Sequence, residues 1–173
     1  MNMIFHWFKK NQLEVPTVKY KKMSRKEASE DLVKLGEDLA NDRHHDKALA
    51  YFNKAIEINP KNDFAWGDRG LMLDKQGRKN EALESFSSAL EINSSNSITW
   101  HNKGLTLMRL DKLSESIECF DKAIEIDAKY AKAWYNRGRA MSMLGKINES
   151  QTSFDTSKKL DPLLYTKLKK MKS

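Results

Sequence analysis

Four histidines, one cysteine and their acidic neighbours are the residues of this chain that could carry chemistry. His44, His45 and Asp46 are adjacent in the sequence, but metal ligands on a helix share one face only at spacings of three or four residues. We therefore interpret this group as polar residues of a turn. Cys119 is the only cysteine, which excludes an intramolecular disulfide and a zinc site built from cysteines. We expect Cys119 to be a small, partly buried residue of a helix.

No catalytic motif with a recognisable mechanism occurs in the sequence. It contains no HExxH, GxSxG, GxxxxGK[ST] or GxGxxG pattern. We therefore predict that the protein is not an enzyme and that it holds no cofactor and no metal ion. A single unpaired cysteine fits a reducing compartment, so we expect a cytoplasmic location.

The positive charge of the chain is concentrated at its two ends. The net charge is +7, yet residues 1–28 hold seven lysines and arginines against two glutamates, and residues 163–173 add four lysines with no acid. The part between them carries 20 basic and 22 acidic residues. A surface that binds the phosphates of a nucleic acid needs basic residues clustered on the folded domain. We therefore expect no specific nucleic-acid partner.

A period of 34 residues organises most of the chain. Tryptophan, glycine and phenylalanine each recur at this spacing, in the series Trp66, Trp100, Trp134; Gly36, Gly70, Gly104, Gly138; and Phe52, Phe86, Phe120, Phe154. A fixed period of this length is the signature of stacked repeats, each a small unit that buries its apolar face against its neighbours. The repeats therefore favour a binding function over a catalytic one.

Residues 1–28 lie outside the period and form a basic extension that we expect to be flexible. Ile4, Phe5, Trp7 and Phe8 precede Lys9 and Lys10. The cluster is far shorter than the ~20 residues of a membrane span, and a signal peptide has its positive charge before its apolar run. Three hypotheses remain: a tail that packs on the first repeat, an arm that contacts an anionic membrane surface weakly through residues 1–10, or a linear motif for a partner.

The repeated residues resemble those of the tetratricopeptide repeat family. The residues that carry the resemblance are Trp66, Gly70, Ala82, Phe86 and Ala89, with Trp100, Gly104, Phe120 and Ala123, and then Trp134, Gly138, Phe154 and Pro162. The resemblance implies an all-α fold, an α-solenoid of four helix-turn-helix repeats at residues 29–62, 63–96, 97–130 and 131–164. Leu164, Leu168 and Met171, interspersed with lysines, predict a basic C-terminal capping helix over residues 165–173.

Turn residues predict how each helix pair is joined. Asp46, Asn80, Ser114 and Asn148 share one register and are predicted to cap the second helix of each repeat. Gly77 and Gly145 are predicted to leave the first helix in a left-handed conformation. Arg43 and Asp111 hold that place in the other two repeats, so those turns are expected to close differently. We expect the repeated phenylalanines to lie between one helix pair and the next.

The resemblance also implies which residues face a concave groove. In the first repeat the groove places hold Glu30, Val33, Lys34, Glu37 and Asn41. In the third and fourth repeats the predicted peptide-binding residues are Asn102, Leu105, Arg109, Lys132, Tyr135, Asn136, Arg139 and Met143. Their charge predicts a ligand with an acidic or carboxylate end, held by Lys132 and Arg139 while Asn102 and Asn136 bond its backbone.

Not every family binding mode fits these residues. Clamps for chaperone tails that end in two carboxylates use five lysine, asparagine and arginine places, and only Lys132 and Asn102 match them. Gly67, Leu71 and Asn136 depart from that pattern, and we therefore do not predict such a clamp.

We predict a non-enzymatic adaptor that binds a protein or peptide segment in its groove. The alternative is a peripheral membrane-associated assembly factor anchored by the Ile4–Lys10 arm, with its repeats as a spacer.

Overall fold

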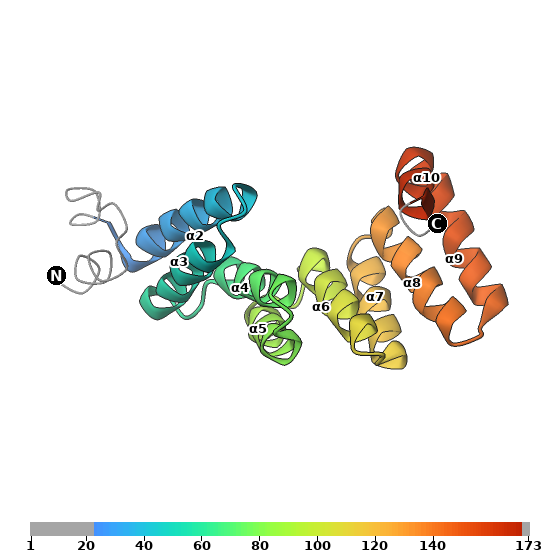
Figure 1. Ribbon diagram of the computed structural model, residues 1–173, viewed down its shortest axis with the longest axis horizontal. Helices are drawn as coiled ribbons and strands as arrows, with labels where there is room; N and C mark the ends of the chain where they lie inside the picture. The colour runs from blue at the N-terminus through green and yellow to red at the C-terminus, as the bar shows by residue number, and fades with distance from the viewer. Residues whose placement is uncertain (1–22, 171–173) are drawn as a thin grey trace. The chain divides into compact units, whose positions relative to one another are not determined.

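The computed structural model describes residues 23–170, and every regular element within this range is a helix (Figure 1). In chain order they are α2 (Arg25–Asn41), α3 (His45–Ile58), α4 (Asp63–Lys75), α5 (Lys79–Ile92), α6 (Ser97–Arg109), α7 (Leu113–Ile126), α8 (Ala131–Met143), α9 (Ile147–Leu160) and α10 (Pro162–Lys170). The predicted arm, Ile4–Lys10, and Met171 lie outside the described residues. The all-α prediction is confirmed.

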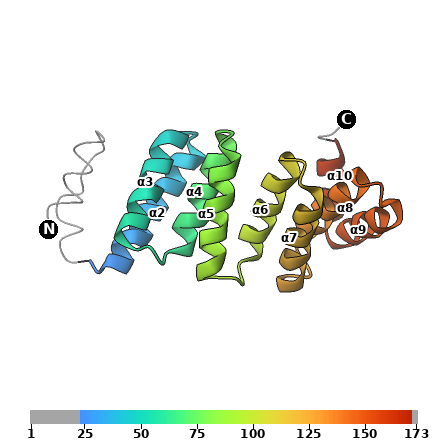
Figure 2. The same cartoon turned by 90° about the horizontal axis from the view of Figure 1, so that it is seen from below.

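The helices form two compact units whose boundary falls inside α4, between Ala65 and Trp66. In the first unit, α2 packs against α3. In the second, α6 packs on α7 and α8 on α9, while α7 contacts α8 and α10 covers α8 and α9 (Figures 1 and 2). Helix α10 begins at Pro162, three residues before the predicted capping segment, and has no buried residue. A helix with one wet face suits the end of a repeat stack.

A glycine and a phenylalanine fix how closely the two helices of each pair approach. A Cβ atom added to Gly104 would lie 2.7 Å from Cε1 of Phe120, and one added to Gly36 only 2.5 Å from Cε1 of Phe52. Such distances leave no room for any side chain. The phenylalanine therefore lies on the glycine of its own pair, a contact that the sequence analysis did not predict. Phe120 also reaches the next pair, where it packs with Met141.

The four turns between paired helices close in the same way, with or without glycine. After α2, the amide of His44 donates to the carbonyl of Leu39 at 2.8 Å, and that of Arg43 donates to Ala40 at 3.2 Å. This is the Schellman arrangement, which needs a left-handed residue. The same two bonds follow α4, α6 and α8. The left-handed residues are Gly77 and Gly145, as predicted, and also Arg43 (φ 63°) and Asp111 (φ 61°), against expectation.

The predicted caps of the second helices are wrong. Helices α3, α5, α7 and α9 begin directly after His44, Arg78, Lys112 and Lys146, none of which caps its helix through a side chain. Asp46 and its equivalents lie inside the first turn instead. The tight turn explains why each second helix begins earlier than predicted. In the first turn, His44 closes the Schellman motif with its amide and is also the last residue before α3. Side-chain caps occur on first helices, at Ser24, Asn62 and Asn96.

Replacing Arg43 or Asp111 by glycine is expected to raise the free energy of unfolding by about 1 kcal/mol each. Both residues hold a positive φ, which a Cβ atom disfavours and glycine does not. Urea unfolding followed by circular dichroism measures the change. Arg43→Ala and Asp111→Ala are the matched controls, because they remove the side chain, keep the Cβ atom and should give no gain. Equal stability of the glycine and alanine variants would show that these turns hold no strain.

Candidate functional site

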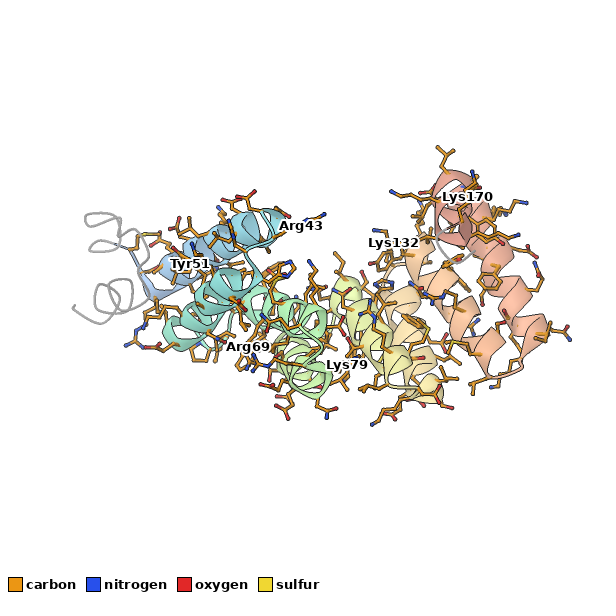
Figure 3. The ribbon with its side chains drawn as sticks, in the orientation of Figure 1. Arg43, Tyr51, Arg69, Lys79, Lys132 and Lys170 are labelled. Atoms are coloured by element: carbon orange, nitrogen blue, oxygen red, sulfur yellow. The ribbon has the colours of Figure 1, made fainter. Side chains whose placement is uncertain are left out.

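The predicted binding residues of the third and fourth repeats lie on α6 and α8, two helices that contact each other in the second unit. Three of them offer side chains to solvent: Lys132 is exposed, Arg109 is half exposed and Met143 is 53% exposed. Figure 3 labels Lys132 on α8, where its side chain projects from the ribbon. Asn102, Leu105 and Arg139 are partly buried. Tyr135 and Asn136 are buried, with only 5% and 7% of their surfaces exposed.

Tyr135 belongs to an aromatic cluster at the C-terminal end of the second unit. Its ring lies 5.4 Å from that of Phe154 and 5.8 Å from that of Tyr165 on α10, in tilted and edge-on arrangements. Such geometries are favourable between aromatic rings. In this structure Tyr135 therefore joins α8 to α9 and α10, and only its remaining 5% of exposed surface faces outward.

His101 is the centre of a buried polar network that the sequence does not reveal. Nδ2 of Asn136 lies 2.9 Å from Nε2 of His101, and the hydroxyl of Tyr130 lies 3.3 Å from Nδ1. An amide nitrogen can only donate, so Nε2 accepts this bond and the ring proton of the neutral histidine is on Nδ1. Nδ1 then donates to the oxygen of Tyr130. The partners lie 35 and 29 residues from His101 in the sequence, which hides the network from motif analysis.

The surroundings of His101 keep it neutral. Burial lowers the pKa of His101 to about 4, and the nearby charge of Lys132 lowers it further, while a hydrogen bond with Asn102 opposes the shift. At neutral pH the ring is therefore an uncharged acceptor for Asn136. Protonation of Nε2 would place its N–H opposite the Nδ2 donor of Asn136, so the hydrogen bond between them would be lost.

Arg139 is held by the same network. Its Nη1 donates to Oδ1 of Asn136 at 3.2 Å, while the amide of Asn136 donates to His101 on its other side. The two bonds fix the orientation of the amide, since exchanging its oxygen and nitrogen would break both. A chain of contacts from Tyr130 through His101 and Asn136 thus positions the guanidinium group of Arg139.

The charge of Arg139 is not balanced by a carboxylate within residues 23–170. Burial lowers the pKa of Arg139; the Tyr135 hydroxyl opposes this shift and the like charge of Arg109 adds to it. Nε of Arg139 is buried and has no hydrogen-bond partner among the described residues. A guanidinium group stays protonated in such surroundings. The site therefore holds a partly buried positive charge for which residues 23–170 supply no counter-ion.

Arg109, in contrast, already has an acidic partner. Its Nη1 donates to Oδ2 of Asp74, a side chain that is only 6% exposed. The second oxygen of Asp74, Oδ1, is buried without a partner among the described residues. The charge of Arg109 is therefore neutralised by Asp74. An anionic ligand is attracted more strongly to Arg139, whose charge no described carboxylate balances.

The repeated tryptophans are structural in the described repeats. The indole nitrogens of Trp100 and Trp134 donate to the carbonyls of Ser94 and Ala128 at 2.9 and 3.0 Å, which ties each first helix to the turn before it. Lys103 and Arg137 lie over these rings at 5.6 and 5.9 Å from their centres. These contacts occupy the edge and one face of each ring.

Neither a metal site nor a membrane span is found in the described part of the chain. Residues 23–170 contain no group of three or more histidine, cysteine, aspartate or glutamate side chains that could hold a metal ion. No helix in this range has the length and apolar character needed to cross a bilayer.

Burial raises the pKa of the Cys119 thiol to about 11, so its reactive thiolate form is scarce at neutral pH.

Comparison with known families agrees with these helix pairs. Models described as "TPR repeat" and "Tetratricopeptide repeat" match residues 104–145, 51–84 and 29–62. The chain belongs to the tetratricopeptide repeat family. Members of this family are α-solenoids that generally serve as non-enzymatic scaffolds for protein interaction. The family resemblance inferred from the tryptophan, glycine and phenylalanine registers is confirmed.

Several solved structures are similar to this chain. MamA (residues 41 to the end) from Desulfovibrio magneticus RS-1 is 21% identical, with a TM-score of 0.71 over 78% of this chain and 76% of that one. PilF of Pseudomonas aeruginosa is 22% identical, with a TM-score of 0.76 over 81% and 64%. At these identities the likeness shows the fold alone. The second TPR of Spaghetti (RPAP3), bound to the HSP90 peptide SRMEEVD, is 28% identical, with a TM-score of 0.57 over 59% and 95%.

A curated relative covers a shorter stretch. The uncharacterized protein MJ0572 of Methanocaldococcus jannaschii is 46% identical over 48 residues, which span 28% of this chain and 56% of that protein. The chain thus matches just over half the length of this relative. The match supports the assignment of a repeat to this stretch and does not bear on activity.

Proposed function

We propose that this tetratricopeptide repeat protein is an adaptor whose third and fourth repeats bind an acidic protein or peptide segment. The guanidinium group of Arg139 is the observation that carries the proposal. It is partly buried, fixed by Asn136 and without a carboxylate partner among residues 23–170. A carboxylate that binds there gains charge-assisted hydrogen bonds from a group that is already oriented.

Neighbouring side chains extend the proposed site along α6 and α8. Lys132 adds an exposed positive charge on the same face of α8, about two turns before Arg139 and at the N-terminal end of the helix. Met143 and Leu105 offer apolar surface at the other end. Asn102 is partly exposed and hydrogen-bonds His101, and we expect its remaining amide groups to bond a peptide backbone. Asn136, predicted to contact the ligand, has internal partners and acts in this proposal by positioning Arg139.

The bound peptide of a similar structure supports an acidic ligand. The HSP90 peptide SRMEEVD on the second TPR of Spaghetti (RPAP3) contains two glutamates and one aspartate. Gly67 and Leu71 offer no side-chain charge or amide where a two-carboxylate clamp would need them. We therefore propose an acidic segment recognised mainly through Arg139 and Lys132, rather than this particular peptide.

Reversing both charges with Lys132→Glu and Arg139→Glu is expected to abolish selection of acidic peptides. The experiment is an array of random heptapeptides probed with the wild-type protein and the double variant. We expect glutamate and aspartate to be enriched in peptides bound by the wild type, and depleted in those bound by the variant, because like charges repel.

The matched control is Lys158→Glu with Lys159→Glu, which reverses two exposed charges in the last turn of α9 and should leave the enrichment unchanged. Circular dichroism confirms that helicity is retained. Equal enrichment for the wild type and the Lys132/Arg139 variant would refute the proposed site.

A further inference from the structure

A separate cavity lies on the first unit and does not belong to the site on α6 and α8. It has a volume of about 240 Å³ and is lined by Glu30, Val33, Lys34, Glu37, Asn62 and Phe64. The α2 residues among these are spaced by three and four, so they form one stripe of that helix. The cavity is large enough for a side chain or two rather than for a whole small-molecule ligand.

The most unusual feature of this cavity is Phe64, a large apolar side chain that is exposed to solvent. Its side chain is 61% exposed beside buried Val33, which is only 5% exposed. Asn62 cannot cover the ring, because its amide already bonds the hydroxyl of Ser29 at 2.9 Å and the amide of Ala65 at 3.1 Å. An exposed aromatic ring at the mouth of an apolar cavity is typical of a surface that binds another apolar side chain.

Two carboxylates flank the apolar part of the cavity. Glu30 pairs with Lys26 only at 3.9 Å, with both side chains more than half exposed, and such pairs contribute little and exchange easily. Glu37 is exposed and has no ion-pair partner among the described residues. With Lys34 as the single base among the lining residues, the cavity favours a ligand that combines an apolar side chain with positive charge.

We propose that this cavity is bound by the N-terminal segment of the same chain, residues 1–22. Five lysines and one glutamate give that segment a positive charge, and Phe5, Trp7 and Phe8 directly precede Lys9 and Lys10. This order places apolar side chains beside positive charge, as the cavity requires. An aromatic side chain of the segment packs on Phe64 while Lys9 and Lys10 reach Glu30 and Glu37.

The covalent connection makes weak contacts sufficient. Residue 22 is three residues before the start of α2, the helix that carries Glu30, Val33 and Glu37. From Arg25 to Val33 the helix advances only about 12 Å, so the segment spans the distance with residues to spare. A short covalent connection gives an effective concentration on the order of millimolar, so a separate partner would need a higher affinity to compete with it.

Carbodiimide cross-linking of the full chain tests the proposal, because this reagent joins an amine and a carboxylate only when they are in contact. We expect mass spectrometry to find amide links from Lys9 or Lys10 to Glu30 or Glu37 in the monomer, at a yield independent of protein concentration. Phe64→Ala should lower that yield several-fold. Ile98→Ala, which removes a side chain of equal exposure (60%) at the same repeat place, should leave it unchanged.

Other outcomes would overturn the proposal. Links found mainly in covalent dimers would assign the cavity to the segment of a second copy. Links spread over acidic residues of both units, or a yield unaffected by Phe64→Ala in a variant with unchanged circular dichroism, would mean that the cavity does not bind this segment. None of these results bears on Arg139 and the acidic ligand.

Discussion

Replacing Phe120 by alanine is expected to lower the free energy of unfolding by about 3–5 kcal/mol. Phe120 is fully buried, lies on Gly104 and packs with Met108 and Met141, so its removal leaves a cavity that joins α6, α7 and α8. Urea unfolding followed by circular dichroism measures the loss. A loss below about 1 kcal/mol would mean that the aromatic ring is not the element that holds the pairs together.

A second substitution separates packing from other effects of Phe120→Ala. Gly104→Ala alone should cost about 1–3 kcal/mol, since its Cβ atom would lie 2.7 Å from the ring. In the Phe120→Ala background the same change should be neutral or stabilising, because the obstacle is gone and alanine favours the helix by about 1 kcal/mol over glycine. Additive effects of the two changes would contradict the proposed contact.

Lowering the pH from 7 to 4 is expected to remove about 3 kcal/mol of stability through His101 alone. The pKa of His101 is about 4 in the folded chain, below the usual 6.5. Protonation therefore favours the unfolded state. The contribution is complete above pH 6.5 and is lost as the pH falls toward 4.

The difference between the wild type and His101→Gln isolates this contribution, because carboxylates titrate alike in both proteins. Between pH 7 and 4 the wild type should lose more stability than His101→Gln, by about the amount above. Nitrogen NMR of the imidazole gives the pKa directly. A midpoint near 6.5 would show that the ring is not buried against Asn136 and Tyr130.

The periodic residues were sufficient to predict the fold. A glycine and a phenylalanine recur every 34 residues, as at Gly104 and Phe120, because each repeat makes the same close contact between them. A contact that is made in every repeat produces a periodic pattern in the sequence. The turns were less predictable. Arg43 and Asp111 adopt a glycine-like conformation because the same Schellman bonds are formed in every repeat, and no local residue signals this.

The repeat places put Arg139 and Lys132 on one helix, and both belong to α8. Their role in binding stays a prediction. The repeat places did not reveal that Asn136 is buried between His101 and Arg139, because the three side chains meet only when α6 and α8 are packed. The pairing of Arg109 with Asp74, 35 residues away, escaped prediction for the same reason.

The most direct test of the proposed function is a double-mutant cycle between Arg139 and one ligand carboxylate. It uses four dissociation constants, measured by calorimetry, for the wild type and Arg139→Gln against an acidic heptapeptide from the array and its Glu→Gln counterpart. We predict a coupling of about 1.5–3 kcal/mol, as for a hydrogen bond between charged groups. A coupling below about 0.5 kcal/mol, with the two changes simply additive, would contradict recognition of an acidic segment by Arg139.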